Sequence, residues 1–266
     1  MDNMTPTVKQ LLIINVMVFI AAQFIEPIDN LFALHYFENN NFQIWQLITH
    51  MFMHGSVMHI AFNMFALVSF GSVLERFWGT KRFLFFYFSC GFGAAVFQMG
   101  VNYFEIHQTL KAAADLNLSS DAIRQILNFN IVEGQYYSGT LLEDALKPFL
   151  ENLGKLQLLN QENFNALFEA TKQSQGQMVG ASGAIYGLLI AFAFMFPDAE
   201  LAMLFIPVPI KAKYFVPIIV LIDLFLGVTS FSGDNVAHFA HIGGALIGFI
   251  MMWTWRNNRY NHKRWN

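Results

Sequence analysis

The stretch GASGAIYGLLIAF, residues 180–192, places a single hydroxyl, that of Ser182, between small residues at the start of an apolar run. Gly183 and Gly187 are four residues apart and share one helix face, where small residues allow a second helix to approach closely. A polar side chain in a membrane helix is costly unless it meets a partner or a water-filled cavity. The stretch therefore predicts a closely packed membrane helix in which Ser182 faces something polar.

The composition of the whole chain is that of a membrane protein. The 266 residues are 55% hydrophobic and 12% charged, with a net charge of −3, whereas soluble domains carry about 25% charged residues. A spanning helix needs about 20 mainly apolar residues, and six segments reach or approach that length: 9–26, 57–74, 83–101, 178–196, 214–231 and 236–255. We expect an all-α, polytopic membrane protein with six transmembrane helices. There is no basic run typical of nucleic-acid binding, and the lone Cys90 excludes an internal disulfide.

The distribution of basic residues predicts the orientation. Residues 27–56 and 232–235 contain no Lys or Arg, and by the positive-inside rule such loops face outward. The opposite side collects the basic residues Arg76, Lys81, Arg82, Lys211, Lys213, Arg256, Arg259, Lys263 and Arg264. We expect both termini in the cytoplasm, residues 256–266 as a basic cytoplasmic tail, and a bacterial inner membrane as the location.

Residues 102–177 are too polar to span a membrane. They carry five Lys or Arg and nine Asp or Glu. Apolar residues recur at helical spacing in this region, at Leu142, Ala145, Leu146, Phe149, Leu153 and Leu156. We expect an extracytoplasmic helical insertion between the third and fourth spans, which divides the membrane domain into residues 1–101 and 178–255. A solvated hairpin without chemistry is the simpler interpretation of the insertion.

Polar residues gather near the outer ends of the three spans that run inward. At a rise of about 1.5 Å per residue, they fall in one layer: His59 and Asn63 in the second span, Ser182 and Tyr186 in the fourth, His238 and His241 in the sixth. Ser182 is expected about 6–8 Å inside its helix. Ala240, Gly244 and Gly248 form a second small-residue face. Close contact of the fourth and sixth spans would bring Ser182 to His241.

The residue types in this layer fit nucleophilic catalysis. A serine needs an adjacent general base, most often histidine, and the oxyanion that follows needs fixed donors such as the side chains of His59 and Asn63. No Asp or Glu occurs at this depth in the fourth or sixth span, so a two-residue pair of Ser182 and His241 is expected. Tyr186, one turn below Ser182, is expected to pack against the imidazole.

In combination, these motifs resemble those of rhomboid intramembrane serine proteases. The resemblance rests on HGSVMHIAFNMF with His59 and Asn63, on GSVLERFWG with Glu75, on GASGAIYG, and on AHFAHIGGALIG. It implies a six-helix rhomboid fold, a Ser182–His241 dyad, and an oxyanion site of His59, Asn63 and the Ser182 N–H, with Gly180, Tyr186 and Gly244 in support. It also implies cleavage of transmembrane protein substrates in the lipid bilayer without metal or cofactor.

Two features depart from the family pattern. Trp45-Gln46 stands where family members often have Trp-Arg, and the insertion is longer than the usual link.

Three other functions compete with this interpretation. The first is a catalytically silent rhomboid-like protein that binds membrane clients, which loss of the serine or the base would favour. The second is a metalloprotein using His50, His54, His59, His238 and His241, although no H-E-x-x-H motif is present. The third is a transporter, supported by Asp223 in the fifth span. The sequence does not reveal a partner for Asp223 and leaves His238 as an accessory residue.

Overall fold

The computed structural model describes residues 4–257 apart from residues 26, 135, 204–205 and 230–235. The chain forms two compact units. The membrane unit comprises Met1–Ala33, Trp45–Gln98 and Met178–Asn266, and the inserted unit comprises Leu34–Ile44 and Met99–Gln177. The predicted basic tail falls mostly outside the described residues, as does the short outer loop at 232–235.

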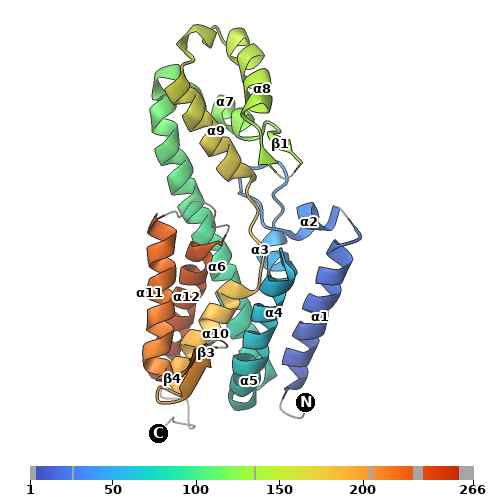
Figure 1. Cartoon of the computed structure of the whole chain (residues 1–266), viewed down its shortest axis with the longest axis vertical. Coiled ribbons are helices and arrows are strands. Elements are labelled where there is room, and N and C mark those ends of the chain that lie inside the picture. The colour runs from blue at the N-terminus through green and yellow to red at the C-terminus, as the bar shows by residue number, and fades with distance from the viewer. Residues whose placement is uncertain (1–3, 26, 135, 204–205, 230–235, 258–266) are drawn as a thin grey trace. The chain divides into compact units, whose positions relative to one another are not determined.

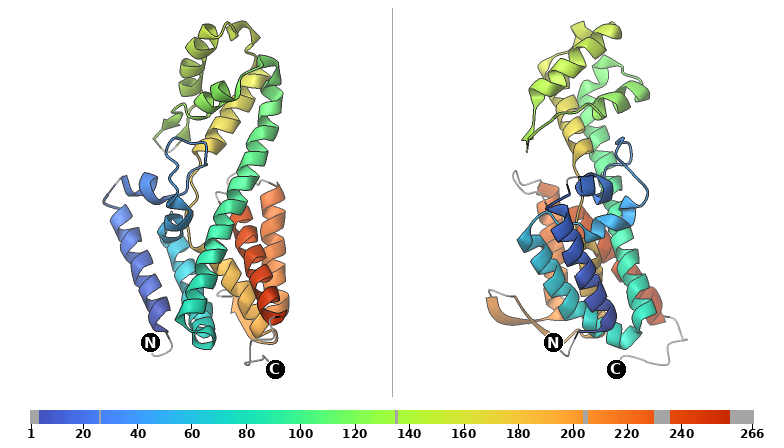
Figure 2. Two further views of the ribbon diagram at one scale, coloured as in Figure 1. Left: turned by 180° about the vertical axis from the view of Figure 1, so that it is seen from behind. Right: turned by 90° about the vertical axis from the view of Figure 1, so that its right-hand side faces the viewer.

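The membrane unit is a helical bundle whose long helices run roughly along one direction (Figures 1 and 2). Its elements are α1 (Pro6–Ala22), α2 (Pro27–Phe32), α3 (Gln46–Thr49), η1 (His50–Phe52), α4 (Val57–Ala66), the π-helical turn η2 (Leu67–Gly71), α5 (Ser72–Trp78), α6 (Thr80–Thr109, shared with the inserted unit), α10 (Ser182–Met195), β3 (Glu200–Met203), β4 (Ile206–Lys211), α11 (Ala212–Thr229) and α12 (His238–Asn257). The antiparallel pair β3–β4 was not predicted, so the chain is mostly but not wholly helical.

Three helices of the described chain are long and apolar enough to cross a membrane: Val57–Trp78, Thr80–Leu116 and Ala212–Thr229. The other predicted spans correspond to α1 and α10, which are apolar but shorter, and to α12. Helix α10 begins at Ser182 rather than at residue 178. The expectation that Ser182 lies about 6–8 Å inside its helix is therefore wrong, because residues 178–181 are not helical and Ser182 opens the first turn.

A buried carboxylate ties the start of the chain to the bundle. Glu75 on α5 accepts hydrogen bonds from the hydroxyl of Thr5, from the backbone N–H of Val8 at 3.2 Å and from the hydroxyl of Thr80 at 2.9 Å. Hydrogen bonds of this kind offset the cost of removing a charged group from water. Glu75 thus fixes α1 and α6 relative to the second span.

Helices α10 and α12 pack with their backbones almost in contact. A methyl group added at Gly244 would lie 1.9 Å from the carbonyl oxygen of Gly183, and one added at Gly248 would lie 2.8 Å from the Cα of Gly187. Both distances are shorter than any van der Waals contact, so only glycine fits these positions. The small-residue faces predicted on the two helices do meet each other, and this contact sets the spacing of the side chains at their outer ends.

The inserted unit has its own core of aliphatic side chains, including Leu116, Ile126, Leu142, Leu146 and Leu167. Its further elements are η3 (Leu110–Leu116), α7 (Ser120–Leu127), β1 (Val132–Glu133), β2 (Tyr136–Tyr137), α8 (Gly139–Asn152), η4 (Leu156–Leu158) and α9 (Gln161–Gln175). Helix α8 ends at Asn152, and Leu153, which was expected on its apolar face, is 43% exposed.

Residues 34–44 belong to the same unit as the insertion. Asn39 donates to the carbonyl of Ser174 at 3.0 Å, and Asn128 donates to the carbonyl of Glu38 at 3.0 Å. Tyr36 packs with Ile106 and other residues of the unit. No periodic pattern in residues 34–44 groups this loop with residues 102–177.

Candidate active site

The segment before α10 is held by the loop that precedes α4. The N–H of Gly180 donates to the carbonyl of His50 at 2.9 Å. Gly180 has φ +120°, and a methyl group there would lie 2.7 Å from Nε2 of His59 and 3.6 Å from Oγ of Ser182. Glycine is required both by the backbone conformation and by the space. Gly180 therefore lies against His59 and Ser182 together.

Hydrogen bonds between uncharged groups hold the loop that precedes α4. Trp45 Nε1 donates to the carbonyl of Leu31 at 2.9 Å, and Gln46 Nε2 donates to that of Asn30 at 3.1 Å. Gln46 is fully buried. Its amide occupies the position at which the Trp-Arg pattern described above has an arginine. Burial lowers the pKa of the neighbouring His50 to about 4, which keeps its ring neutral near pH 7.

Ser182 and His241 meet at hydrogen-bonding distance. Oγ of Ser182 lies 2.8 Å from Nε2 of His241. The ring of Tyr186 stacks on the imidazole, with centroids 4.4 Å apart and planes inclined by 10°. The stacked ring limits rotation of the imidazole about its side-chain bonds. Ser182 and His241 are both partly buried, and the side chain of His241 is 12% exposed.

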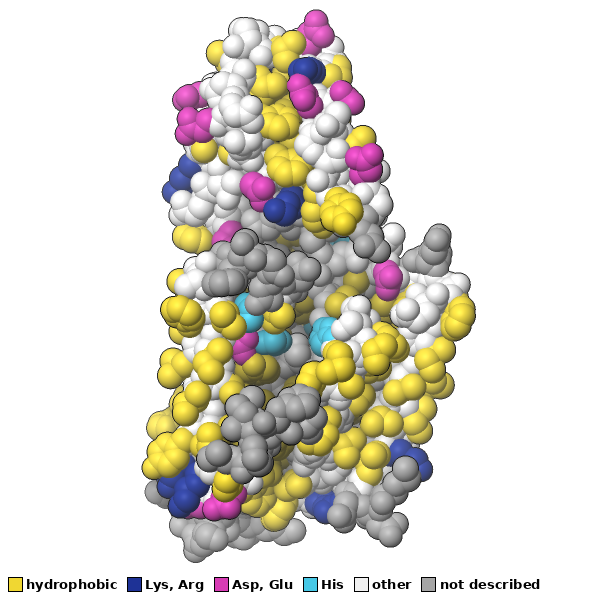
Figure 3. All heavy atoms as spheres, in the orientation of Figure 1, with side chains coloured by type: hydrophobic (Ala, Val, Ile, Leu, Met, Phe, Trp, Pro, Cys, Tyr) yellow, Lys and Arg dark blue, Asp and Glu magenta, His cyan; other side chains and the backbone are white. Residues whose placement is uncertain are grey.

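A carboxylate that was not predicted at this site completes the group. Oδ1 of Asp223, on α11, lies 3.1 Å from Nδ1 of His241 and 2.5 Å from Nδ1 of His238. The hydroxyl of Tyr186 donates to Oδ2 of the same carboxylate. The fourth and sixth spans carry no acid at this depth, and the fifth span supplies one. Figure 3 shows histidine and acidic side chains side by side midway along this face.

His59 and Asn63 lie on α4, whose first turn is capped by Ser56. The Ser56 side chain accepts a hydrogen bond from the His59 N–H at 3.1 Å. Asn63 is buried, and its Nδ2 has no hydrogen-bond partner among the residues that the structure describes. A buried amide without a partner is uncommon, because the unmade bond is costly. Asn63 therefore carries a donor available to a bound group.

The histidines do not form the metal cluster considered from sequence. Among the described residues, the group with ligand spacing is Asp223, His238 and His241, whose ligand atoms lie within 4.8 Å of one another. Two ligands of a tetrahedral zinc ion lie about 3.4 Å apart at normal bond lengths. The 2.5 Å contact between His238 and Asp223 is shorter and corresponds to a hydrogen bond.

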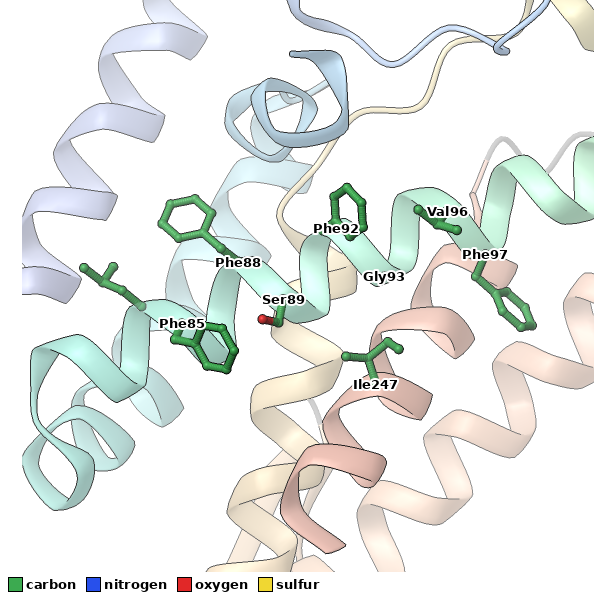
Figure 4. Close-up of a pocket in the computed structure, with 9 residues that line it drawn as sticks. Phe85, Phe88, Ser89, Phe92, Gly93, Val96, Phe97 and Ile247 are labelled. Atoms are coloured by element: carbon green, nitrogen blue, oxygen red, sulfur yellow. The ribbon is translucent and has the colours of Figure 1, made fainter. Parts of the chain in front are cut away.

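A hollow in the described chain lies elsewhere in the membrane unit. A cavity of about 850 Å³ opens along α6 between Phe85, Phe88, Phe92 and Ile247 (Figure 4). Its lining is apolar apart from Ser89, and none of its lining residues belongs to the Ser182–His241 group. No titratable side chain lines this cavity.

The family of the chain follows from comparison with known proteins. The Rhomboid domain model matches residues 41–106 and 155–258, which is more than half of the chain. The chain therefore belongs to the rhomboid family, a family of polytopic membrane proteins. The match leaves out residues 107–154, which lie within the inserted unit.

Several relatives are similar over shorter or longer parts. A mitochondrial rhomboid protein of Schizosaccharomyces pombe is 25% identical over 207 residues, 77% of this chain and 49% of that protein. The rhomboid protease GlpG of Haemophilus influenzae is 31% identical over 74 residues, 27% of this chain and 38% of that protein. The rhomboid protease GluP of Bacillus subtilis is 38% identical over 52 residues, 20% of this chain and 10% of that protein. The chain spans about half or less of the length of these relatives. One of these relatives is mitochondrial and two are bacterial. Membership of the family therefore does not decide whether this chain lies in a bacterial inner membrane, as predicted.

Proposed function

We propose that this chain is a serine endopeptidase that cleaves transmembrane segments of membrane proteins. The observation that carries the proposal is the 2.8 Å contact between Ser182 Oγ and His241 Nε2. A serine hydroxyl becomes a strong nucleophile when a base at this distance accepts its proton. Two relatives are named rhomboid proteases, which supports the same chemistry.

In the proposed reaction, Ser182 Oγ attacks the carbonyl carbon of the scissile peptide bond while its proton passes to His241 Nε2. The carbonyl electrons move to the oxygen, which becomes an oxyanion. When this intermediate collapses, the C–N bond breaks and His241 returns the proton to the leaving amine. Water then repeats the sequence on the acyl-enzyme, and Ser182 is regenerated.

The oxyanion is proposed to lie between α4 and the start of α10. The N–H of Ser182 belongs to the first turn of a helix, where backbone N–H groups have no acceptor within the helix. Asn63 Nδ2 and the ring of His59 supply further donors. Donors fixed before the reaction stabilise the developing charge without reorganisation.

We further propose six membrane spans, with residues 1–101 providing the first three helices and residues 178–255 the last three. The insertion 102–177 is placed on the extracytoplasmic side, and both termini, including the tail 256–266, on the cytoplasmic side. Basic residues are collected in the loops assigned to the cytoplasm, which supports this orientation.

The reaction is tested by cleavage of a model single-span membrane protein in proteoliposomes. Ser182→Ala and His241→Ala should each abolish the cut, which mass spectrometry should locate within the membrane-spanning segment. A catalytically silent, client-binding protein would retain the substrate without cutting it. Cleavage that persists in Ser182→Ala and stops with a chelator would point to metal chemistry instead.

A further inference from the structure

We infer that Asp223 is a positioning residue for His241, so that the serine and histidine act with a third, acidic member. This inference rests on the proposed function and deepens it, because it assigns a role to a carboxylate supplied by a different helix. It differs from the two-residue dyad that the resemblance implies.

The first argument is the direction in which Asp223 points. Helix α11 is lined by exposed apolar side chains: Ile222 is 52% exposed and Leu224 is 41% exposed. Asp223, between them, is only 6% exposed. A carboxylate on an apolar membrane helix is expensive and is tolerated when it faces the bundle interior and is paired. The bundle interior on this side contains the imidazole of His241.

The second argument concerns the proton on His241. An ionised carboxylate can only accept hydrogen bonds, so the 3.1 Å contact with Asp223 requires a proton on Nδ1 of His241. A neutral imidazole carries one proton, which leaves Nε2 as an acceptor. Nε2 is the atom that lies 2.8 Å from Ser182 Oγ. Asp223 therefore selects the tautomer that can accept the serine proton.

The third argument is the support of the carboxylate itself. Oδ1 accepts from Nδ1 of His238 at 2.5 Å, and Oδ2 accepts from the hydroxyl of Tyr186. Tyr186 also stacks on the His241 ring. These contacts hold the carboxylate and the imidazole in one arrangement. When His241 takes the serine proton, the resulting imidazolium lies against a fixed negative charge.

The experiment measures the rate of labelling of the purified full chain by a fluorophosphonate between pH 5 and pH 9. Asp223→Asn should slow labelling at pH 7 by about 10⁴-fold, the order of loss found when the orienting acid of a serine protease is removed. The pH profile of labelling should also differ from that of the wild type, because the imidazolium formed on His241 loses its anionic neighbour. The titratable side chains around His241 are Asp223, His238, Tyr186 and His59. Asp223→Glu should restore part of the rate.

Two further variants keep the test sharp. Asp198→Asn removes an exposed carboxylate bound to Lys211 and Lys213 and should label as fast as the wild type. His238→Ala should slow labelling less than Asp223→Asn, since Tyr186 still holds the carboxylate. Thermal unfolding of each variant shows whether it is folded.

Equal rates and equal pH profiles for Asp223→Asn and the wild type would overturn the inference, even if the variant unfolds at a lower temperature. Such a result would leave the proposed function standing as a two-residue mechanism. Absence of labelling in the wild type would instead contradict the proposed function itself.

Discussion

His241 is the residue on which the other side chains of the site converge. Its Nε2 faces Ser182, its Nδ1 faces Asp223 and its ring lies against Tyr186. The contact with Asp223 sets the tautomer of the imidazole, and the contact with Tyr186 restricts rotation of the ring. The ring then presents Nε2 to Ser182. A histidine held in this way needs little reorganisation when it accepts a proton.

Asn63 is expected to act on the transition state rather than on binding. Loss of one oxyanion donor commonly lowers kcat by about 10²–10³-fold. Asn63→Ala should lower kcat for a model substrate in proteoliposomes by this order, with little change in KM. Asn165→Ala, an exposed substitution on α9, should change neither constant. A change confined to KM would show that Asn63 positions substrate instead.

At the residue scale, spacing along each helix was sufficient to predict the contact of Ser182 on α10 with His241 on α12. Spacing from the start of a helix does not reveal Asp223. Helix α11 runs outward, so the depth of Asp223 has to be measured from the C-terminal end of α11. Asp223 is six residues from the end of α11 and His241 is three residues from the start of α12. At a rise of about 1.5 Å per residue, the depths of Asp223 and His241 below the outer ends of their helices differ by less than one helical turn.

At the scale of elements, the contact of α10 with α12 decides whether the site exists. Gly244→Ala would force a methyl group against the backbone of Gly183. Overpacking of this kind costs about 1–3 kcal/mol, and backbone cannot move aside as a side chain can. The two helices should separate, so that both the unfolding temperature and the fluorophosphonate labelling rate fall.

Gly100→Ala is the matched control for this prediction. Gly100 is also helical, and a methyl group there meets nothing within 4 Å. Alanine is favoured over glycine in a helix by about 1 kcal/mol, so the control should be neutral or stabilising. Equal losses in Gly244→Ala and Gly100→Ala would contradict the role assigned to the close contact.

The six apolar segments identified by composition all contain helices, although their ends differ by several residues. Hydrophobic length does not define where a helix begins, and just before Ser182 the Gly180 N–H donates to the carbonyl of His50 instead of entering the helix. The association of residues 34–44 with the inserted unit depends on contacts distant in sequence, such as that of Asn39 with Ser174. The strands β3 and β4 form a local antiparallel pair. Periodicity within one segment carries no information about either.

For the whole molecule, the apolar surface of the membrane unit determines how the chain can lie in a bilayer. Hydrophobic side chains cover its face, and Lys and Arg side chains gather toward one end (Figure 3). This distribution fits a bilayer with one basic side. The orientation proposed above places that side in the cytoplasm.

The orientation is tested by cysteine labelling in intact cells. In a Cys90→Ser background, Ser120→Cys on α7 should react with an impermeant thiol reagent, whereas Lys81→Cys should react only after lysis. Both positions are exposed in the structure, so accessibility depends on the side of the membrane. The reverse pattern would overturn the proposed topology.

The central claim, that His241 activates Ser182 as a nucleophile, is tested most directly by mapping the site of fluorophosphonate attachment on the purified chain. We expect mass spectrometry to find the phosphonyl group on Ser182, with labelling lost in Ser182→Ala, strongly reduced in His241→Ala and unaffected by a chelator. Attachment at another residue, or labelling of His241→Ala at the wild-type rate, would contradict the account.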